Sequence, residues 1–154
     1  MSGYLPVSAK DLRWLNLACK AAEKNDAGVY RLAAIAVKGG SVLNIGINKH
    51  RNNPLWLPEL ARTEWSTHAE ESCLKHLDTA NGCTLYIVRI TPGGHTALAM
   101  PCKECQNLAI SRNISKIIYT TDTGVETLKL RDLPVPVRGR SRNVARGMKY
   151  PVHA

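Results

Sequence analysis

Two short motifs carry metal-binding side chains at separate points of this 154-residue chain, and the fold must bring them together. They are Thr67-His68-Ala69-Glu70 and Pro101-Cys102-Lys103-Glu104-Cys105. The imidazole of His68 and the thiolates of Cys102 and Cys105 suit Zn²⁺, and three protein ligands leave a fourth position open, as in catalytic zinc sites. A fourth Cys or His at finger-like spacing, which a structural site needs, is missing from the sequence. The motifs therefore predict a catalytic zinc site.

Glu70, two residues after the first ligand, is the candidate acid–base group. Zinc lowers the pKa of a bound water toward neutrality, and hydrolysis also needs a side chain that carries protons. Residues two apart do not share a helix face, so His68 is expected to bind metal while Glu70 reaches the reacting groups. We expect Thr67 to cap this helix, which runs to about Leu77 or Thr79.

The pattern H-x-E followed by P-C-x-x-C resembles the signature of the zinc-dependent cytidine and deoxycytidylate deaminase superfamily. The runs 84–88 and 114–119 look like the strands that flank the site in deoxycytidylate deaminases. Gly46-Ile47-Asn48 resembles the upstream segment whose asparagine contacts the substrate, so the resemblance covers roughly residues 30–121. It implies a three-layer α-β-α fold with a mixed five-stranded sheet, and Glu70 as the catalytic acid–base.

The resemblance implies hydrolytic removal of an amino group from a nucleobase, with dCMP to dUMP as the first choice of reaction. Asn48 and the backbone around Ala69 are then expected to orient the sugar and base, although position alone favours a turn-forming asparagine. It also implies a homo-oligomer whose subunits complete one another's pockets.

Other functions stay open. One is deamination of cytosine or adenine in tRNA or single-stranded DNA, and another is deamination of free cytidine or deoxycytidine. A non-catalytic binding module is disfavoured because binding alone would not need Glu70.

Composition bounds the partners. The chain has 21 Lys and Arg against 12 Asp and Glu, a formal net charge of +9, which favours a nucleotide or nucleic-acid partner. We expect no membrane partner and a cytoplasmic location, because no run approaches the ~20 apolar residues of a membrane span and the start lacks a signal-peptide core. Cys19, Cys73 and Cys83 are expected to be small core side chains.

The pattern along the chain predicts strands and helices in alternation. A helix from Ser8 to about Asn25 is expected to bury one face; the residues of that face are Leu12, Leu15, Cys19 and Ala22. Strands are expected at 31–37 and 42–47 with a Gly39-Gly40 hairpin turn between them, and further strands at 83–91, 116–121 and 126–130. A second ligand-bearing helix starts near Pro101. This order predicts an α/β sheet covered by helices.

Residues 49–66 are expected to form a long connection that walls the pocket. Within it Arg51 is a candidate phosphate contact and Trp65 a candidate stacking surface for a base. The alternative is a solvated loop anchored by its tryptophans.

We divide the chain into a deaminase domain at 1–132 and a basic tail at 133–154, which carries five positive charges and no acidic residue. The tail is interpreted as a nucleic-acid arm, as an arm that brings an arginine to a neighbouring subunit's nucleotide, or as a disordered solubilising segment.

Overall fold

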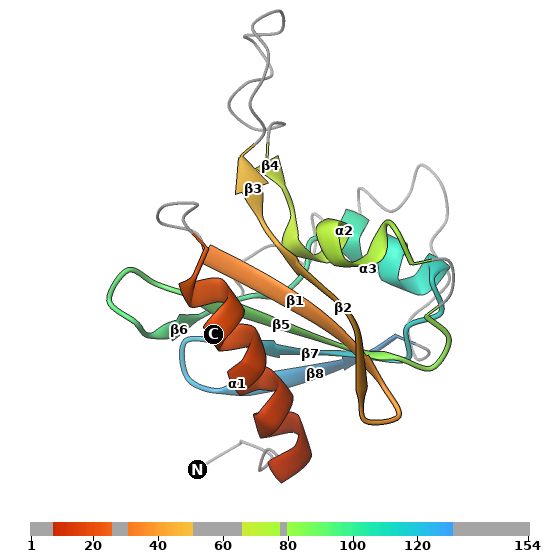
Figure 1. The fold of residues 1–154 in the computed structure, drawn as a ribbon, viewed down its shortest axis with the longest axis horizontal. Helices are drawn as coiled ribbons and strands as arrows, with labels where there is room; N and C mark the ends of the chain where they lie inside the picture. Colours follow the sequence, from red (N-terminus) through yellow and green to blue (C-terminus); the bar gives the residue numbers. More distant parts are fainter. Residues whose placement is uncertain (1–7, 26–30, 51–65, 78–79, 131–154) are drawn as a thin grey trace, which may run out of the picture.

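The computed structural model describes residues 8–25, 31–50, 66–77 and 80–130 (Figure 1). The helices are α1 (Ala9–Glu23), α2 (Ala69–Leu74) and α3 (Lys103–Ser111). The strands are β1 (Arg31–Lys38), β2 (Ser41–Ile47), β3 (Lys49–His50), β4 (Ser66–Thr67), β5 (Thr84–Ile90), β6 (Thr96–Ala97), β7 (Lys116–Thr120) and β8 (Val125–Lys129). None of these described helices is both long and apolar enough to cross a membrane.

One mixed sheet organises the described residues. Its main path runs β2-β1-β5-β7-β8, in which β5 and β7 are parallel and the other neighbours antiparallel. The predicted five strands are confirmed, and the two-residue β6 adds a short sixth beside β5. The parallel pair β5–β7 lies in the interior of the sheet and is joined through α3, as expected of a β-α-β unit.

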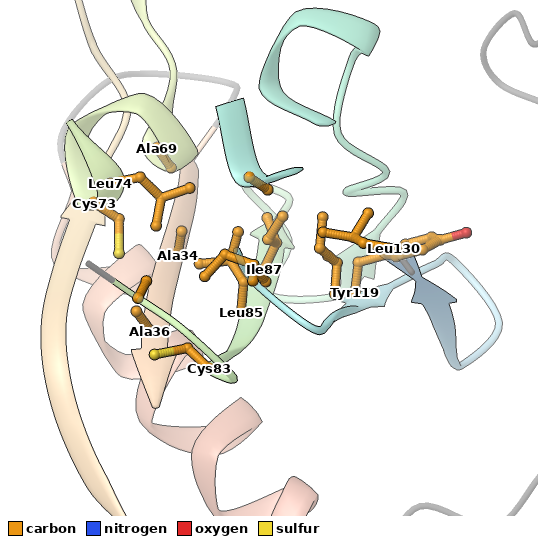
Figure 2. Packing of buried hydrophobic residues seen from close by; sticks show 14 of the residues in the cluster. Ala34, Ala36, Ala69, Cys73, Leu74, Cys83, Leu85, Ile87, Tyr119 and Leu130 are labelled. Carbon is orange, nitrogen blue, oxygen red and sulfur yellow. The ribbon is translucent and has the colours of Figure 1, made fainter. Parts of the chain in front are cut away.

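Helices cover both faces of the sheet, which confirms the three-layer fold (Figure 1). On one face α1 packs on Ala33, Ile35 and Val88 from the central strands. On the other face α2 and α3 pack on a second core, which includes Leu85 and Ile87 of β5 (Figure 2). The central strands therefore bury both faces, which explains the continuous apolar run of β5.

The first helix follows its predicted bounds but turns slightly from the predicted face. Ser8 caps it, with its hydroxyl oxygen accepting from the backbone N–H of Asp11 at 3.0 Å. Leu15 and Ala22 are buried as expected, whereas Leu12 is 49% exposed. Trp14 is only 8% exposed, so the buried face runs through Trp14, Leu15, Ala18 and Ala22.

The β1–β2 hairpin turns at Gly39 and Gly40, as predicted, with φ of 59° and 81°. At the other end of β2, the chain continues into a separate two-stranded ladder of β3 and β4 (Figure 1). This ladder gives regular structure to the two ends of the segment 49–66, which was expected to be a connection throughout. The intervening residues, including Arg51 and Trp65, lie outside the described part of the chain.

Candidate active site

The three predicted metal ligands come together where α2 and α3 begin. His68 precedes α2 and Cys102 precedes α3, both with extended backbone, and Cys105 lies in the first turn of α3. His68 Nδ1 lies 3.3 Å from Cys105 Sγ and 3.7 Å from Cys102 Sγ. All three ligand atoms lie within 4.8 Å of one another.

These separations fit a single zinc ion. Tetrahedral coordination with Zn–S near 2.3 Å and Zn–N near 2.0–2.1 Å places an N and an S ligand atom about 3.6 Å apart. The measured N–S distances of 3.3 and 3.7 Å lie on either side of that value. Exposure increases from the buried Cys105, through the half-buried Cys102, to the exposed His68, so one side of the site opens to solvent. The residues therefore fit zinc with an accessible fourth position.

Hydrogen bonding within the trio shifts the pKa values of its members. The bond from Cys105 lowers the pKa of Cys102 to about 4, and the same bond raises the pKa of Cys105. The bond to Cys102 raises the pKa of His68 to about 9. Zinc needs thiolates and a neutral imidazole, so its binding displaces the protons that these groups share.

The helix that carries His68 differs from the prediction. Thr67 belongs to β4, where its backbone pairs with Lys49, and His68 takes the N-cap position instead. The helix ends at Leu74, and Leu77 N–H donates to the Leu74 carbonyl in a tighter turn. The pairing of β3 with β4 thus holds Thr67 in a strand, although the local sequence predicts this residue at the N-cap of the helix. In the second motif, Pro101 precedes the N-cap Cys102 and does not open the helix.

Glu70 lies in the first turn of α2, two residues after His68, and is only 4% exposed. Burial raises its pKa to about 7. A carboxyl group with a pKa near neutrality exchanges protons readily in both directions, as general acid–base catalysis requires. Ala69, between these two residues, is buried against the sheet (Figure 2).

Asn48 comes directly after β2, as predicted, and takes part in a hydrogen-bonded junction. Its side-chain oxygen accepts from Leu32 N–H at 2.8 Å and from the side-chain amide of Asn25 at 2.6 Å. These bonds tie the end of α1 to the edge of the sheet. The partners lie 16 and 23 positions away in the sequence, so these are not the local bonds of a turn-forming asparagine, and contact with a substrate remains a prediction.

Sequence reasoning missed the polar residues that hold the ligand-bearing helices. Asn44 of β2 donates its side-chain amide to the Cys73 carbonyl at 2.8 Å. Gln106 is 2% exposed and donates to the Pro101 carbonyl at 3.0 Å, directly before Cys102. For Asn44 the signal available was a polar side chain within the apolar run of β2, which is costly unless it has a specific partner. Gln106 follows Lys103, Glu104 and Cys105 and gave no such signal.

Comparisons with known proteins agree with this site. The family model described as the cytidine and deoxycytidylate deaminase zinc-binding region matches residues 8–121. A search of curated proteins found no match.

Two solved structures of one phage enzyme share the fold. The apo dCMP deaminase of cyanophage S-TIM5 matches with a TM-score of 0.54 and 20% identity, over 77% of this chain and 87% of that one. The same phage enzyme in complex with dCMP and dUMP matches with a TM-score of 0.54 and 17% identity, over 89% and 90% of the two chains. Cytidine deaminase from Mycobacterium leprae gives a TM-score of 0.45 at 20% identity, over 73% of this chain and 88% of that one.

Fold and site together define a three-layer α-β-α protein with three side chains placed to hold a zinc ion. Because the family model spans most of the sequence, the chain belongs to the cytidine and deoxycytidylate deaminase zinc-binding family. Membership supports a deaminating enzyme with zinc as its cofactor, for which His68, Cys102 and Cys105 are placed to act as ligands.

Proposed function

We propose that this protein removes the amino group of a cytosine nucleotide by hydrolysis, with dCMP converted to dUMP and ammonia. The observation that carries the proposal is the buried Glu70 beside a three-ligand zinc site open to solvent. A structural zinc site has no use for a protonatable carboxyl at this position, whereas a hydrolytic site requires one.

The reaction assigns distinct tasks to the residues. Zinc, when bound, polarises water and so makes a nucleophile available near neutral pH. Glu70 takes one proton from the attacking water and delivers it to the ring nitrogen N3 as the C4–O bond forms. It then takes the second proton from the new C4 hydroxyl and delivers it to the amino group, so that the C4–N bond breaks, a C4 carbonyl forms, and one water is consumed for one ammonia released. Asn48 and the Ala69 backbone are proposed to orient the sugar and base.

Charge and similarity support a nucleotide as the substrate. The formal net charge of +9 favours a phosphorylated ligand over a neutral nucleoside. The S-TIM5 enzyme, which shares the fold, has been solved in complex with dCMP and dUMP. Arg51 as a phosphate contact and Trp65 as a stacking surface belong to this proposal and lie outside the described residues.

A second candidate, deamination of a base in tRNA or single-stranded DNA, is favoured by one observation. The segment 133–154 holds five positive charges without an acidic residue, and such a segment suits backbone phosphates. This segment, the domain boundary before it, assembly into a homo-oligomer and a cytoplasmic location all remain predictions.

Ammonia release from a panel of substrates tests both candidates. The panel contains cytidine, deoxycytidine, CMP, dCMP, cytosine-containing single-stranded DNA and unmodified tRNA. We expect dCMP to exceed deoxycytidine by at least about tenfold, the equivalent of one charge-assisted hydrogen bond to the phosphate. Activity confined to DNA or tRNA, and abolished when the five basic residues of 133–154 are changed to Gln, would instead establish the nucleic-acid enzyme.

A further inference from the structure

The helix α2 carries His68 at its start and Glu70 in its first turn, yet it is only six residues long. A helix of this length does not hold its shape alone, and its last carbonyls need partners from outside. No residue of its last turn is basic. Its position must therefore be fixed by neighbouring elements.

Arg112, at the C-cap of α3, supplies such partners. Its Nε donates to the Leu74 carbonyl at 3.2 Å, and its Nη2 donates to the Lys75 carbonyl at 3.4 Å. These carbonyls lie at the end of α2, where a cation also interacts favourably with the helix dipole. The guanidinium of Arg112, at the end of α3, thus caps the C-terminal end of α2.

The backbone of Arg112 is itself well fixed. Ile114 N–H donates to the Ala109 carbonyl at 3.1 Å and Asn113 N–H donates to the Ile110 carbonyl at 3.0 Å. With Asn113 at φ of 63°, these bonds form the Schellman motif that ends α3. Because its backbone is fixed at the end of α3, Arg112 holds the end of α2 in a defined position relative to α3.

The two helices are joined at both ends. They begin at the ligand trio of His68, Cys102 and Cys105, and they end at Arg112. Between these points buried side chains of both helices belong to one core cluster, with Cys73 and Leu74 from α2 and Ala109 from α3. The helix α2 is only about 9 Å long, so its two ends move together. A tilt of α2 against α3 at the Arg112 end would therefore change the distance from His68 to the two thiols.

We propose that Arg112 is a positioning residue for zinc. It sets the angle between α2 and α3, and so fixes the separation of His68 from Cys102 and Cys105. Asn44 acts differently, since its hydrogen bond joins α2 to β2. The inference rests on the zinc site and is independent of which base is deaminated.

The test compares full-length variants by zinc affinity, measured by competition with a chromophoric chelator, and by the visible spectrum of the Co²⁺-substituted protein. Arg112→Met keeps the apolar stem and removes the donors. We expect zinc affinity about tenfold weaker, at the lower end of the effects seen for residues that orient metal ligands, with altered Co²⁺ bands. Arg112→Lys keeps one donor and should lose about threefold.

Two controls separate positioning from general stability. Ser111→Ala removes a hydroxyl that bonds the Leu108 carbonyl within α3 at 2.7 Å. Tyr86→Phe removes a hydrogen bond to Asp11 on the opposite face of the sheet. Both should keep zinc affinity within about twofold of wild type, because neither touches the α2–α3 junction.

Wild-type zinc affinity and Co²⁺ bands in Arg112→Met would overturn the proposal, as would an equal loss of affinity in Tyr86→Phe. If Arg112→Met yields no folded protein, Arg112→Lys decides, and unchanged zinc affinity in that variant would overturn the proposal equally. Ammonia release does not enter the test, so a wrong substrate assignment leaves its result intact.

Discussion

Gly46 of β2 lies directly against the backbone of α2 at Cys73. A Cβ placed on Gly46 would come within 2.5 Å of the Ala69 carbonyl oxygen and 2.8 Å of Cys73 Cα, and closer still to Cys73 N. These are backbone atoms of the helix that bears His68 and Glu70, so no rotamer change relieves the contact.

Gly46→Ala should therefore push α2 off the sheet. We expect a loss of about 3 kcal/mol in the free energy of unfolding, the upper end for overpacking, with weakened zinc binding. Urea unfolding and chelator competition measure the two effects. The matched control is Gly93→Ala, where the nearest atom to the added Cβ would be His95 Nδ1 at 3.5 Å. Equal behaviour of the two variants would contradict the close approach.

Glu70→Gln should lower turnover by several orders of magnitude while leaving zinc in place. The amide fills the same buried space but cannot exchange protons, and a general acid–base group contributes about 10²–10⁴ in rate. Zinc content by atomic absorption and ammonia release on the best substrate measure the outcome. Glu71→Gln, one residue along the same helix, is the control and should keep most of the activity. Comparable rates for the two variants would remove Glu70 from its assigned role.

Cys102→Ala should lose the metal, because a site with two remaining protein ligands binds zinc far less tightly. Cys83→Ala is the control, because Cys83 is a fully buried core thiol directly before β5 (Figure 2). It should keep stoichiometric zinc at some cost in stability. Full zinc occupancy of purified Cys102→Ala would show that Cys102 is not a ligand.

Tyr86 donates its hydroxyl to a carboxylate oxygen of Asp11 at 2.6 Å and so joins β5 to α1. Tyr86→Phe should lower the free energy of unfolding by about 1.5–3 kcal/mol, the range for hydrogen bonds to charged groups, with zinc binding unchanged. Chemical unfolding at pH 7 measures this loss, and an unfolding curve identical to wild type would contradict it.

The same tyrosine shapes the alkaline limit of stability. Burial raises the pKa of Tyr86 above its ordinary value of 10. The folded state then holds a proton that the unfolded state releases, so the stability contributed is complete below pH 10 and declines as pH rises further. The loss above pH 10 should be smaller in Tyr86→Phe than in wild type. Thermal unfolding between pH 9 and pH 11 tests the difference.

The sequence was sufficient for the ligand trio and for most elements of the fold. His68, Cys102 and Cys105 were found because zinc chemistry restricts ligand type and spacing, and the strands because apolar runs between turn residues are strong local signals. The Gly39-Gly40 turn followed from the need for positive φ.

The remaining features depend on contacts between distant segments. The pairing of Thr67 with Lys49 overrode the local capping signal, and the packing of α1 on the sheet buries Trp14 while it leaves Leu12 exposed. The guanidinium of Arg112 meets α2 only after both helices have packed. None of these has a signature in a single sequence.

The ligand trio also has a consequence for chain entropy. His68 and Cys102 are separated by 34 positions (102 − 68), and the intervening segment contains β5. A bond through one metal ion closes this segment into a loop in any state that retains the metal. By analogy with a disulfide, closing a loop of this length removes about 3–4 kcal/mol of conformational freedom from the unfolded chain. The same three side chains that would hold the cofactor for chemistry would then also fasten an interior strand of the sheet.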